Sequence, residues 1–190
     1  MRTTSVNAQR TIAAAALITF CKRGYAPATL EEIGAQVGLT RGAVLHHFKS
    51  KGALLAAVVD PCRQAIAQLL IATPLGDPPT PSQQSQLLTG FADVFIAHRD
   101  TLSLLANDIS SRAQLGLDDQ WFMPPKLLVA LLAGSNADRA DQVRVAAAIG
   151  ALIQPVTWAW VDLDGADGRA ELIAAAVAVF HQPRPLGGTL

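Results

Sequence analysis

The sequence predicts an all-α protein, and two observations lead to this fold class. Apolar residues recur at intervals of three and four along most of the chain, which places them on one face of a helix. Residues that cap helices precede several of these runs, and glycine or proline closes them. The hydrophobic content of 51% comes from alanine rather than from aromatic residues, which make up 5%.

The first helix is expected from about Asn7 to Lys22, after a polar, flexible arm at residues 1–6. Gly24 closes this helix, and Tyr25-Ala-Pro leads to the next one. Its buried face is formed by Ile12, Ala15, Ala16 and Phe20.

Residues 29–51 predict two short helices joined by a tight turn. Thr29 caps the first helix, and Glu32 returns a bond to the Thr29 backbone, as in a capping box. Gly38 supplies the left-handed conformation that ends this helix. Its inner face is formed by Leu30, Ile33 and Val37.

Thr40 caps the second of these helices, which turns Val44 and Phe48 inward at a spacing of four residues. The outward face carries Gly42, Ala43, Leu45 and His46. This arrangement is a helix-turn-helix in which the second helix faces outward as the reading helix. An ordinary capped hairpin with a solvated face is the alternative interpretation.

The outward residue types suit contact with DNA. Arg41 has donors that bridge two acceptors of guanine, and Gly42 is too small to obstruct entry into a major groove. Histidine rings add donors, and the following lysines are placed to touch the phosphate backbone. The candidate DNA contacts are Thr29, Thr40, Arg41, Gly42, Ala43, Leu45, His46, His47, Lys49 and Lys51.

Residues 10–51 resemble, without a gap, the DNA-binding domain of the TetR family of transcriptional repressors. The matching positions are Arg10, Ile12, Ala15, Ala16, Phe20, Gly24-Tyr25, Thr29, Ile33, Val37-Gly38-Leu39-Thr40, Gly42, His47-Phe48 and Lys49-Ser50-Lys51. The resemblance implies three N-terminal helices that bind DNA and further helices that bind a ligand and dimerise. Leu45 departs from the family pattern, because a tyrosine that contacts DNA usually stands there. Gly52 also departs from it, because that position is commonly acidic.

The charges divide unevenly along the chain. Residues 1–60 carry seven Lys/Arg and three Asp/Glu, a net charge of +4, whereas residues 61–190 have a net charge of −4. A basic head and an acidic body fit a protein that meets the phosphates of double-stranded DNA with one end only.

Further helices follow, separated by breakers. One runs from Lys51 to about Ile71 with a kink expected at Pro61, and the proline-rich residues 73–81 form a loop or linker. A helix from about Ser82 carries Leu87, Leu88, Phe91, Val94, Phe95 and His98 on one face. A shorter helix is expected from about Asp100 to Arg112.

The last part of the chain predicts three more helices. Pro124-Pro125 starts a helix that ends at Gly134, and the longest helix is expected from Asp138 to Asp164, bent at Pro155. The chain then turns at Gly165 and Gly168 before a helix from about Arg169 to His181. The expected domains are a DNA-binding domain at residues 1–50, a ligand-binding and dimerisation domain at 51–182, and a flexible tail at 183–190.

Aromatic and adaptable side chains gather in the acidic part of the chain, where they predict an apolar pocket for a small-molecule effector. Gln154 would orient the ligand, and His98 either bonds to it or lies at a helix end in partial contact with water. Core packing is the alternative for each residue. The candidate ligand residues are Phe91, Phe95, His98, Trp121, Phe122, Met123, Gln154 and Trp158.

The final two helices are rich in small residues, which let helices approach closely. A monomer would cover both of their faces poorly, so we expect a homodimer joined by a four-helix bundle, as the family resemblance also implies. The candidate interface residues are Ala147, Ala151, Leu172, Ile173, Ala176, Val177 and Phe180.

No catalytic constellation, cofactor motif or metal site is predicted. The aspartates of 162–168 lack the spacing of a calcium loop and are better explained as a polar turn. Cys21 and Cys62 stand alone, which argues against a disulfide framework or a zinc site and suits the cytoplasm. The run at residues 12–21 imitates a secretory signal, but bulky Phe20 is wrong for processing. No stretch is expected to approach the roughly 20 apolar residues that are needed to cross a membrane.

The sequence therefore predicts a ligand-responsive transcriptional regulator, most simply a repressor, that binds an inverted-repeat operator as a homodimer. Two other classes of protein remain as alternatives. One is a DNA-binding activator or scaffold without an effector, and the other is a small helical enzyme whose hairpin has no role in DNA binding.

Overall fold

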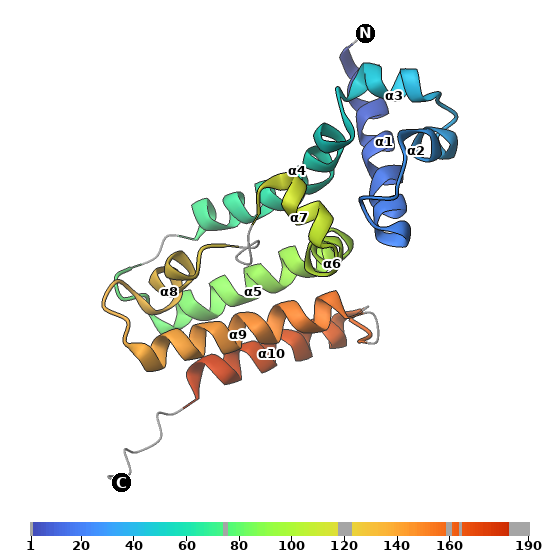
Figure 1. Ribbon diagram of the computed structural model, residues 1–190. Coiled ribbons are helices and arrows are strands. Elements are labelled where there is room, and N and C mark those ends of the chain that lie inside the picture. The colour runs from blue at the N-terminus through green and yellow to red at the C-terminus, as the bar shows by residue number, and fades with distance from the viewer. Residues whose placement is uncertain (1, 74–75, 118–122, 159–160, 164, 183–190) are drawn as a thin grey trace. The chain divides into compact units, whose positions relative to one another are not determined.

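The computed structural model describes residues 2–73, 76–117, 123–158, 161–163 and 165–182, and within them it contains ten α-helices and no strand (Figure 1). The all-α prediction is confirmed. The helices are α1 (Arg2–Arg23), α2 (Leu30–Gln36), α3 (Arg41–His47), α4 (Lys51–Ala72), α5 (Pro81–Ala97), α6 (Arg99–Asn107), α7 (Ile109–Leu115), α8 (Pro125–Ala133), α9 (Arg139–Thr157) and α10 (Ala166–His181).

The chain divides into two compact units. Unit 1 comprises residues 1–67 and 98–122, and unit 2 comprises residues 68–97 and 123–190. Unit 1 thus combines the three N-terminal helices with most of α4 and with α6 and α7, which lie later in the sequence. The expected domain boundary at residue 50 stays a prediction, and the two compact units divide the chain at other positions.

One apolar core holds unit 1 together. Ile12 and Phe20 of α1 meet Ile33 of α2 and Val44 of α3 in this core, and all four are at most 1% exposed. Leucines of α4 and α6 belong to the same cluster, namely Leu54, Leu55, Leu104 and Leu105. Because these helices share one core, the N-terminal hairpin is packed against a segment that begins fifty residues further along the chain.

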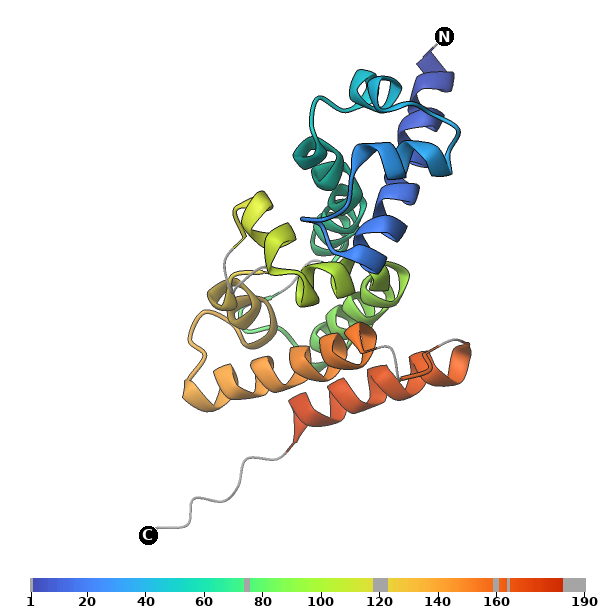
Figure 2. The same cartoon turned by 45° about the vertical axis from the view of Figure 1, so that its right-hand side comes forward.

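Unit 2 is built from α5, α8, α9 and α10. Helices α9 and α10 run side by side in both views (Figures 1 and 2), and α5 packs against both of them. The guanidinium of Arg169 on α10 donates two hydrogen bonds to the carboxylate of Asp93 on α5, at 2.5 and 2.9 Å. This pair links the two helices at the surface of the unit.

Three helix boundaries differ from the sequence-based expectation. Helix α1 begins at Arg2, so residues 2–6 are helical rather than a flexible arm. Helix α9 ends at Thr157, well before Asp164, and its 19 residues are fewer than the 22 of α1 and of α4. Helix α10 begins at Ala166, because Gly165 takes the positive φ of 92° that turns the chain, and Gly168 lies inside the helix. The expected tail at residues 183–190 lies outside the described residues.

The helix expected from Asp100 to Arg112 is two helices. Asp108 takes an extended conformation (φ −116°, ψ 99°), ends α6 and begins α7. Its carboxylate accepts a hydrogen bond from the Ser111 backbone N–H at 3.0 Å, as an N-cap does. The guanidinium of Arg112 donates to the carbonyls of Leu105 and Ala106 at 2.6 and 2.9 Å. The polar groups exposed by the break are therefore bonded on both sides.

Two features of α4 bear on the sequence-based expectations. Pro61 lies within this uninterrupted helix, as Pro155 does within α9. Among the described residues α4 alone is long and apolar enough to cross a membrane, by length and composition only, so the expectation that no such stretch exists was wrong. Its buried residues Leu54, Leu55, Val58 and Val59 belong to the core of unit 1, and the exposed charges of Asp60 and Arg63 lie in the middle of the helix.

Gly34 allows the closest approach within the helix-turn-helix. The Leu39 backbone N–H donates to the Gly34 carbonyl at 2.8 Å. A Cβ atom at position 34 would lie 2.5 Å from the Leu39 carbonyl oxygen and 3.2 Å from Cγ2 of Val44. Backbone cannot move aside as a flexible side chain does, so only glycine fits here.

We expect Gly34→Ala to lower the free energy of unfolding by about 1–3 kcal/mol, because the methyl group forces the turn away from α2. Thermal denaturation followed by circular dichroism measures the change. Gly150→Ala on α9 is the control, since a Cβ there meets no atom within 4 Å. That variant should gain about 0.5–1 kcal/mol from the better helix propensity of alanine. Equal stability of Gly34→Ala and the wild type would contradict the steric argument.

Candidate nucleic-acid interface

The turn between α2 and α3 is fixed by the caps that the sequence predicts. Thr29 accepts from the Glu32 N–H at 3.2 Å, and the Glu32 carboxylate accepts from the Thr29 N–H at 3.0 Å, so the capping box is present. The Glu32 pKa is lowered, first by the Thr29 backbone N–H. Gly38 has the predicted left-handed conformation, with φ 70°. Thr40 accepts from the Ala43 N–H at 3.2 Å and begins α3.

Helix α3 presents one face to the core and the opposite face to solvent. Val44 is fully buried and Phe48 is 8% exposed, as predicted. The outward face exposes Arg41, Gly42, Leu45 and His46, while Ala43 and His47 are partly buried. Thr29, Thr40 and Lys49 are also exposed. Four of the candidate DNA contacts, Arg41, Gly42, Leu45 and His46, are thus exposed on α3, and their contact with DNA stays a prediction.

Gly42 has a different setting from Gly34. Outside the neighbouring residues and the backbone of the same helix, a Cβ placed at Gly42 would meet only the Thr40 hydroxyl, at 3.9 Å. The residue has helical geometry and no crowding, so neither packing nor backbone strain requires glycine there. The space in front of the first turn of α3 is open to an incoming surface.

Lys51 is engaged inside unit 1. Its ammonium donates to the carbonyls of Tyr25, Ala26 and Ala28 at 2.9, 2.9 and 3.0 Å, and it lies 4.5 Å from the centre of the Tyr25 ring. These bonds hold the loop that connects α1 to α2. A contact between Lys51 and DNA phosphate stays a prediction, and it would require the ammonium to leave these carbonyls.

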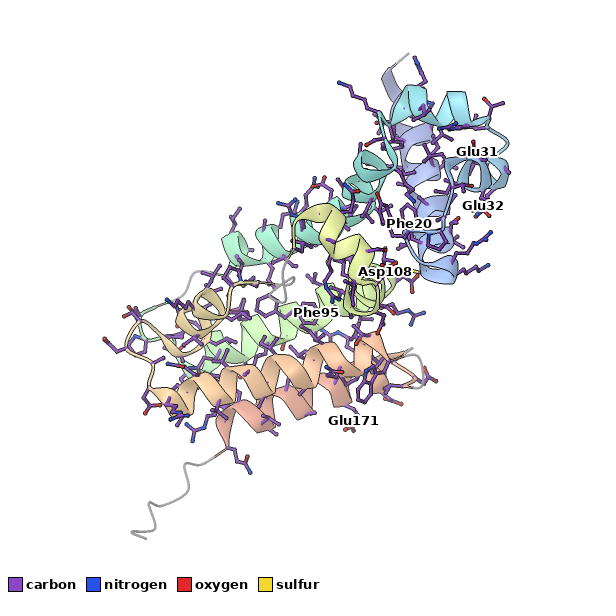
Figure 3. The ribbon with its side chains drawn as sticks, in the orientation of Figure 1. Phe20, Glu31, Glu32, Phe95, Asp108 and Glu171 are labelled. Atoms are coloured by element: carbon purple, nitrogen blue, oxygen red, sulfur yellow. The ribbon has the colours of Figure 1, made fainter. Side chains whose placement is uncertain are left out.

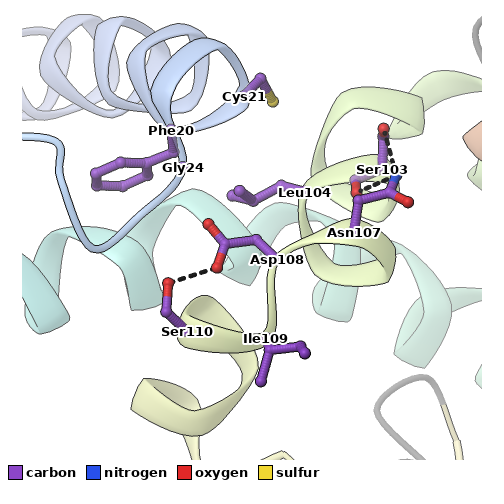
Figure 4. A pocket seen from close by; sticks show the side chains of 9 residues that line it. All are labelled: Phe20, Cys21, Gly24, Ser103, Leu104, Asn107, Asp108, Ile109 and Ser110. Carbon is purple, nitrogen blue, oxygen red and sulfur yellow. Dashed lines mark hydrogen bonds between the residues drawn. The ribbon is translucent and has the colours of Figure 1, made fainter.

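Asp108 reaches the same loop from the α6–α7 corner. One carboxylate oxygen accepts from the Tyr25 N–H at 2.5 Å, and the other accepts from Ser110 and Ser111. Figure 4 shows the carboxylate beside Phe20 and Gly24, at the end of α1. Burial would raise the pKa of Asp108, but the hydrogen bonds from Ser110, Tyr25 and Ser111 outweigh it and hold the pKa below its usual value.

The two cysteines do not have the properties of reactive or metal-binding thiols. Burial, with a contribution from the charge of Asp100, raises the pKa of Cys21 to about 11, and burial raises that of Cys62 to about 11. Both thiols are therefore protonated at neutral pH, when a nucleophile or a metal ligand would be a thiolate. Within the described part of the chain, no group of three His, Cys, Asp or Glu residues is arranged to hold a metal.

The candidate ligand residues do not gather around one cavity. Phe91 and Phe95 are fully buried in unit 2, with ring centres 5.6 Å apart, and Met123 is 8% exposed. His98 belongs to unit 1, where it precedes α6, and burial lowers its pKa. Gln154 and Trp158 are exposed at the end of α9, and Trp121 and Phe122 lie outside the described residues. A shared pocket for these side chains stays a prediction.

Two cavities involve residues that sequence reasoning missed. A cavity of about 290 Å³ in unit 1 lies between α4, α6 and α7. A second cavity of about 550 Å³ in unit 2 lies between α8 and α9. Four leucines line the first cavity, and their apolar side chains were the only sign of it in the sequence. They are Leu102, Leu105, Leu115 and Leu117. Sequence spacing gave no indication of an empty space behind them.

The candidate dimer residues divide into two groups. Leu172, Ala176 and Phe180 are buried within unit 2, where α10 packs against α9 and α5. Ala147 is exposed, and Ala151, Ile173 and Val177 are partly exposed. Val143, 63% exposed, extends the exposed apolar surface along α9. The first group stabilises the unit itself, and the second group remains available at its surface.

Comparison with known proteins agrees with this geometry. The sequence model of the family described as bacterial regulatory proteins, tetR family, matches residues 12–58. The uncharacterised HTH-type transcriptional regulator YerO of Bacillus subtilis (strain 168) is 35% identical over 95 residues. That match covers 47% of this chain and 32% of YerO, so the chain spans about a third of the length of this relative.

Two solved structures share the fold over nearly the whole chain. A regulator of the TetR/AcrR family from Thermobifida fusca YX-ER1 has a TM-score of 0.58 at 22% identity, covering 94% of this chain and 100% of its own. A TetR-like regulator from Rhodococcus sp. RHA1 has a TM-score of 0.65 at 20% identity, covering 92% and 96%. Residues 12–58 thus match the tetR family of bacterial regulatory proteins, and the chain shares the fold of these two solved structures.

Proposed function

We propose that this protein is a transcriptional repressor of the cytoplasm that binds double-stranded DNA as a homodimer and leaves its operator when a small apolar effector binds. The observation that carries the proposal is the outward face of α3, where exposed Arg41 begins a helix whose inner face is buried. The regulator names of its relatives support the same function.

DNA recognition is proposed to depend on the first turn of α3. The Arg41 guanidinium has the donor geometry to bond to O6 and N7 of one guanine in the major groove. Open space at Gly42 lets the backbone approach the bases, and His46 follows one turn later on the same face. Lys49 is exposed after the helix and is assigned to phosphate, which positions the protein without reading sequence.

Arg41→Ala should weaken binding to the preferred DNA by about 1–3 kcal/mol and relax the choice of one base pair, because a bidentate guanine contact is lost. Lys49→Ala is the matched control, and it should weaken binding to all sequences by a similar factor. Both variants are compared with the wild type by fluorescence anisotropy, on a duplex selected from a random pool and on a shuffled duplex. An equal loss on both duplexes from Arg41→Ala would assign that residue to phosphate.

A homodimer is proposed to form through α9 and α10. The exposed alanines of these helices let two copies approach closely, and the partly exposed Ile173 and Val177 add apolar area. An interface with two-fold symmetry uses the same patch on both copies. Two reading helices related by that symmetry would recognise an inverted repeat with half-sites about one helical turn apart.

Ala147→Glu should shift the particle from dimer to monomer, since a carboxylate placed between apolar surfaces loses its water without gaining a partner. Sedimentation velocity at micromolar concentration measures the shift. Ala67→Glu is the control, because Ala67 is equally an exposed alanine but lies on α4. A wild type that sediments as a monomer, or a dimer that survives Ala147→Glu, would count against this interface.

The effector is proposed to bind in the 290 Å³ cavity of unit 1. Its walls include Val59 and Ile66 of α4 with Leu102 and Leu105 of α6, which favours a compact apolar molecule. Val59 and Leu105 also belong to the core that contains the α1–α3 residues. A ligand that moves them would alter the packing of the DNA-binding helices. By linkage, DNA would then weaken effector binding by the same factor that the effector weakens DNA binding.

Ile66→Trp should fill this cavity and weaken the binding of anilinonaphthalene sulfonate, an anionic fluorescent dye with an apolar ring system, by about tenfold, which corresponds to the loss of about 1.4 kcal/mol. Val129→Trp, placed in the cavity between α8 and α9, is the matched control and should bind the dye as the wild type does. DNA affinity without dye reports whether each variant remains folded. If Val129→Trp lost dye binding and Ile66→Trp kept it, the effector site would be assigned to the cavity of unit 2 instead.

A further inference from the structure

The guanidinium that is proposed to read DNA already has a partner. The Nε atom of Arg41 lies 3.4 Å from Oε1 of Glu31, and both side chains are about 60% exposed. Glu31 is in the first turn of α2 and Arg41 in the first turn of α3, so the ion pair crosses the turn of the helix-turn-helix. Figure 3 shows Glu31 on α2, next to Glu32.

Glu32, the residue next to Glu31, already stabilises the N-terminus of α2. Glu32 completes the capping box with Thr29 and pairs with Arg23. A second carboxylate in the first turn stabilises the helix dipole only modestly, and any acidic residue would do so. The position of Glu31 therefore matters mainly through Arg41 and through the surface that both share.

A carboxylate at this position acts differently on the two kinds of DNA contact. A phosphate offers Arg41 charged oxygens of the kind that the Glu31 carboxylate already supplies, so the exchange gains little. A guanine offers two neutral acceptors, O6 and N7, at a fixed place in the major groove that only the matching sequence supplies. The negative charge also repels every phosphate that approaches the turn. The repulsion acts equally on any sequence, whereas the competition for Arg41 weakens binding to arbitrary sequence more than binding to the correct one.

We propose that Glu31 is a specificity-determining residue, which restrains Arg41 and so suppresses binding to DNA that lacks the matching guanine. This inference rests on the proposed function. Glu31 acts through Arg41 and touches no base, so it is a positioning residue. Its effect is limited to the size expected of an exposed ion pair, about threefold to fivefold in affinity.

Glu31→Gln tests the proposal, because glutamine keeps the size of the side chain and removes its charge. Two duplexes are used: one selected by the wild-type protein from a randomised pool, and a shuffled duplex of the same composition. We expect affinity for the shuffled duplex to rise about threefold to fivefold and affinity for the selected duplex to rise less than twofold. The salt dependence on the shuffled duplex should steepen by about one counterion, because Arg41 becomes available to phosphate.

Two further variants separate this effect from simpler ones. Glu171→Gln on α10 changes the net charge equally and should leave both affinities unchanged. Glu31→Gln in an Arg41→Ala background should also have no effect on the ratio of the two affinities. Glu31→Ala should reproduce Glu31→Gln, and the thermal midpoint of each variant shows that it is folded.

The outcomes distinguish failure of this inference from failure of the proposed function. If the wild-type protein selects no duplex, the proposed function fails and the inference fails with it. If the wild type is selective but Glu31→Gln leaves the ratio of affinities unchanged, only the inference is overturned. An effect on the ratio that persists without Arg41 would likewise overturn it, because Glu31 would then act on DNA by itself.

Discussion

Two opposite charges hold the loop between α1 and α2, and the orientation of the helix-turn-helix depends on them. The Lys51 ammonium, at the start of α4, uses three hydrogen bonds on three carbonyls of this loop. The Asp108 carboxylate, at the start of α7, accepts the N–H of Tyr25 in the same loop. A loop without regular structure leaves its backbone polar groups to find partners elsewhere, and these two side chains supply them. Helix α2 begins at the next residues, so its direction follows the loop.

The bonds of Lys51 and Asp108 to this loop also connect regions that are distant in the sequence. Asp108 both caps α7 and accepts the hydrogen bond from the Tyr25 N–H. Leu105 lines the cavity between α4, α6 and α7 and also belongs to the core that contains the residues of α1–α3. A shift of the α6–α7 corner by a fraction of a hydrogen-bond length would thus be felt at the α1–α2 loop. The coupling would pass through a continuous series of hydrogen bonds and packed leucines.

Residue spacing along the sequence was sufficient to predict the caps and the turn of the helix-turn-helix, but it was insufficient in other parts of the chain. The caps at Thr29 and Thr40 and the left-handed Gly38 depend on residues three or four positions apart, so the sequence predicted them correctly. The break at Asp108 was missed, although Asp108 and Ser111 have the spacing of an N-cap, because apolar periodicity continues on both sides. Gly34 and Lys51 have roles that depend on contacts across the fold, and no spacing reveals them. The buried Phe91 and Phe95 show how aromatic content alone does not separate a pocket from a packed interior.

The shared core of unit 1 has a consequence for how the protein comes apart. Leu54 and Leu55 of α4 and Leu104 and Leu105 of α6 seal the underside of the three N-terminal helices. A fragment that ended at residue 50 would expose that underside to water, and small domains have little reserve of buried area to lose. The hairpin is therefore not an autonomous folding module. It should melt in one cooperative transition with α4, α6 and α7, and amide protection in α3 would report the integrity of helices that lie far from it in the chain.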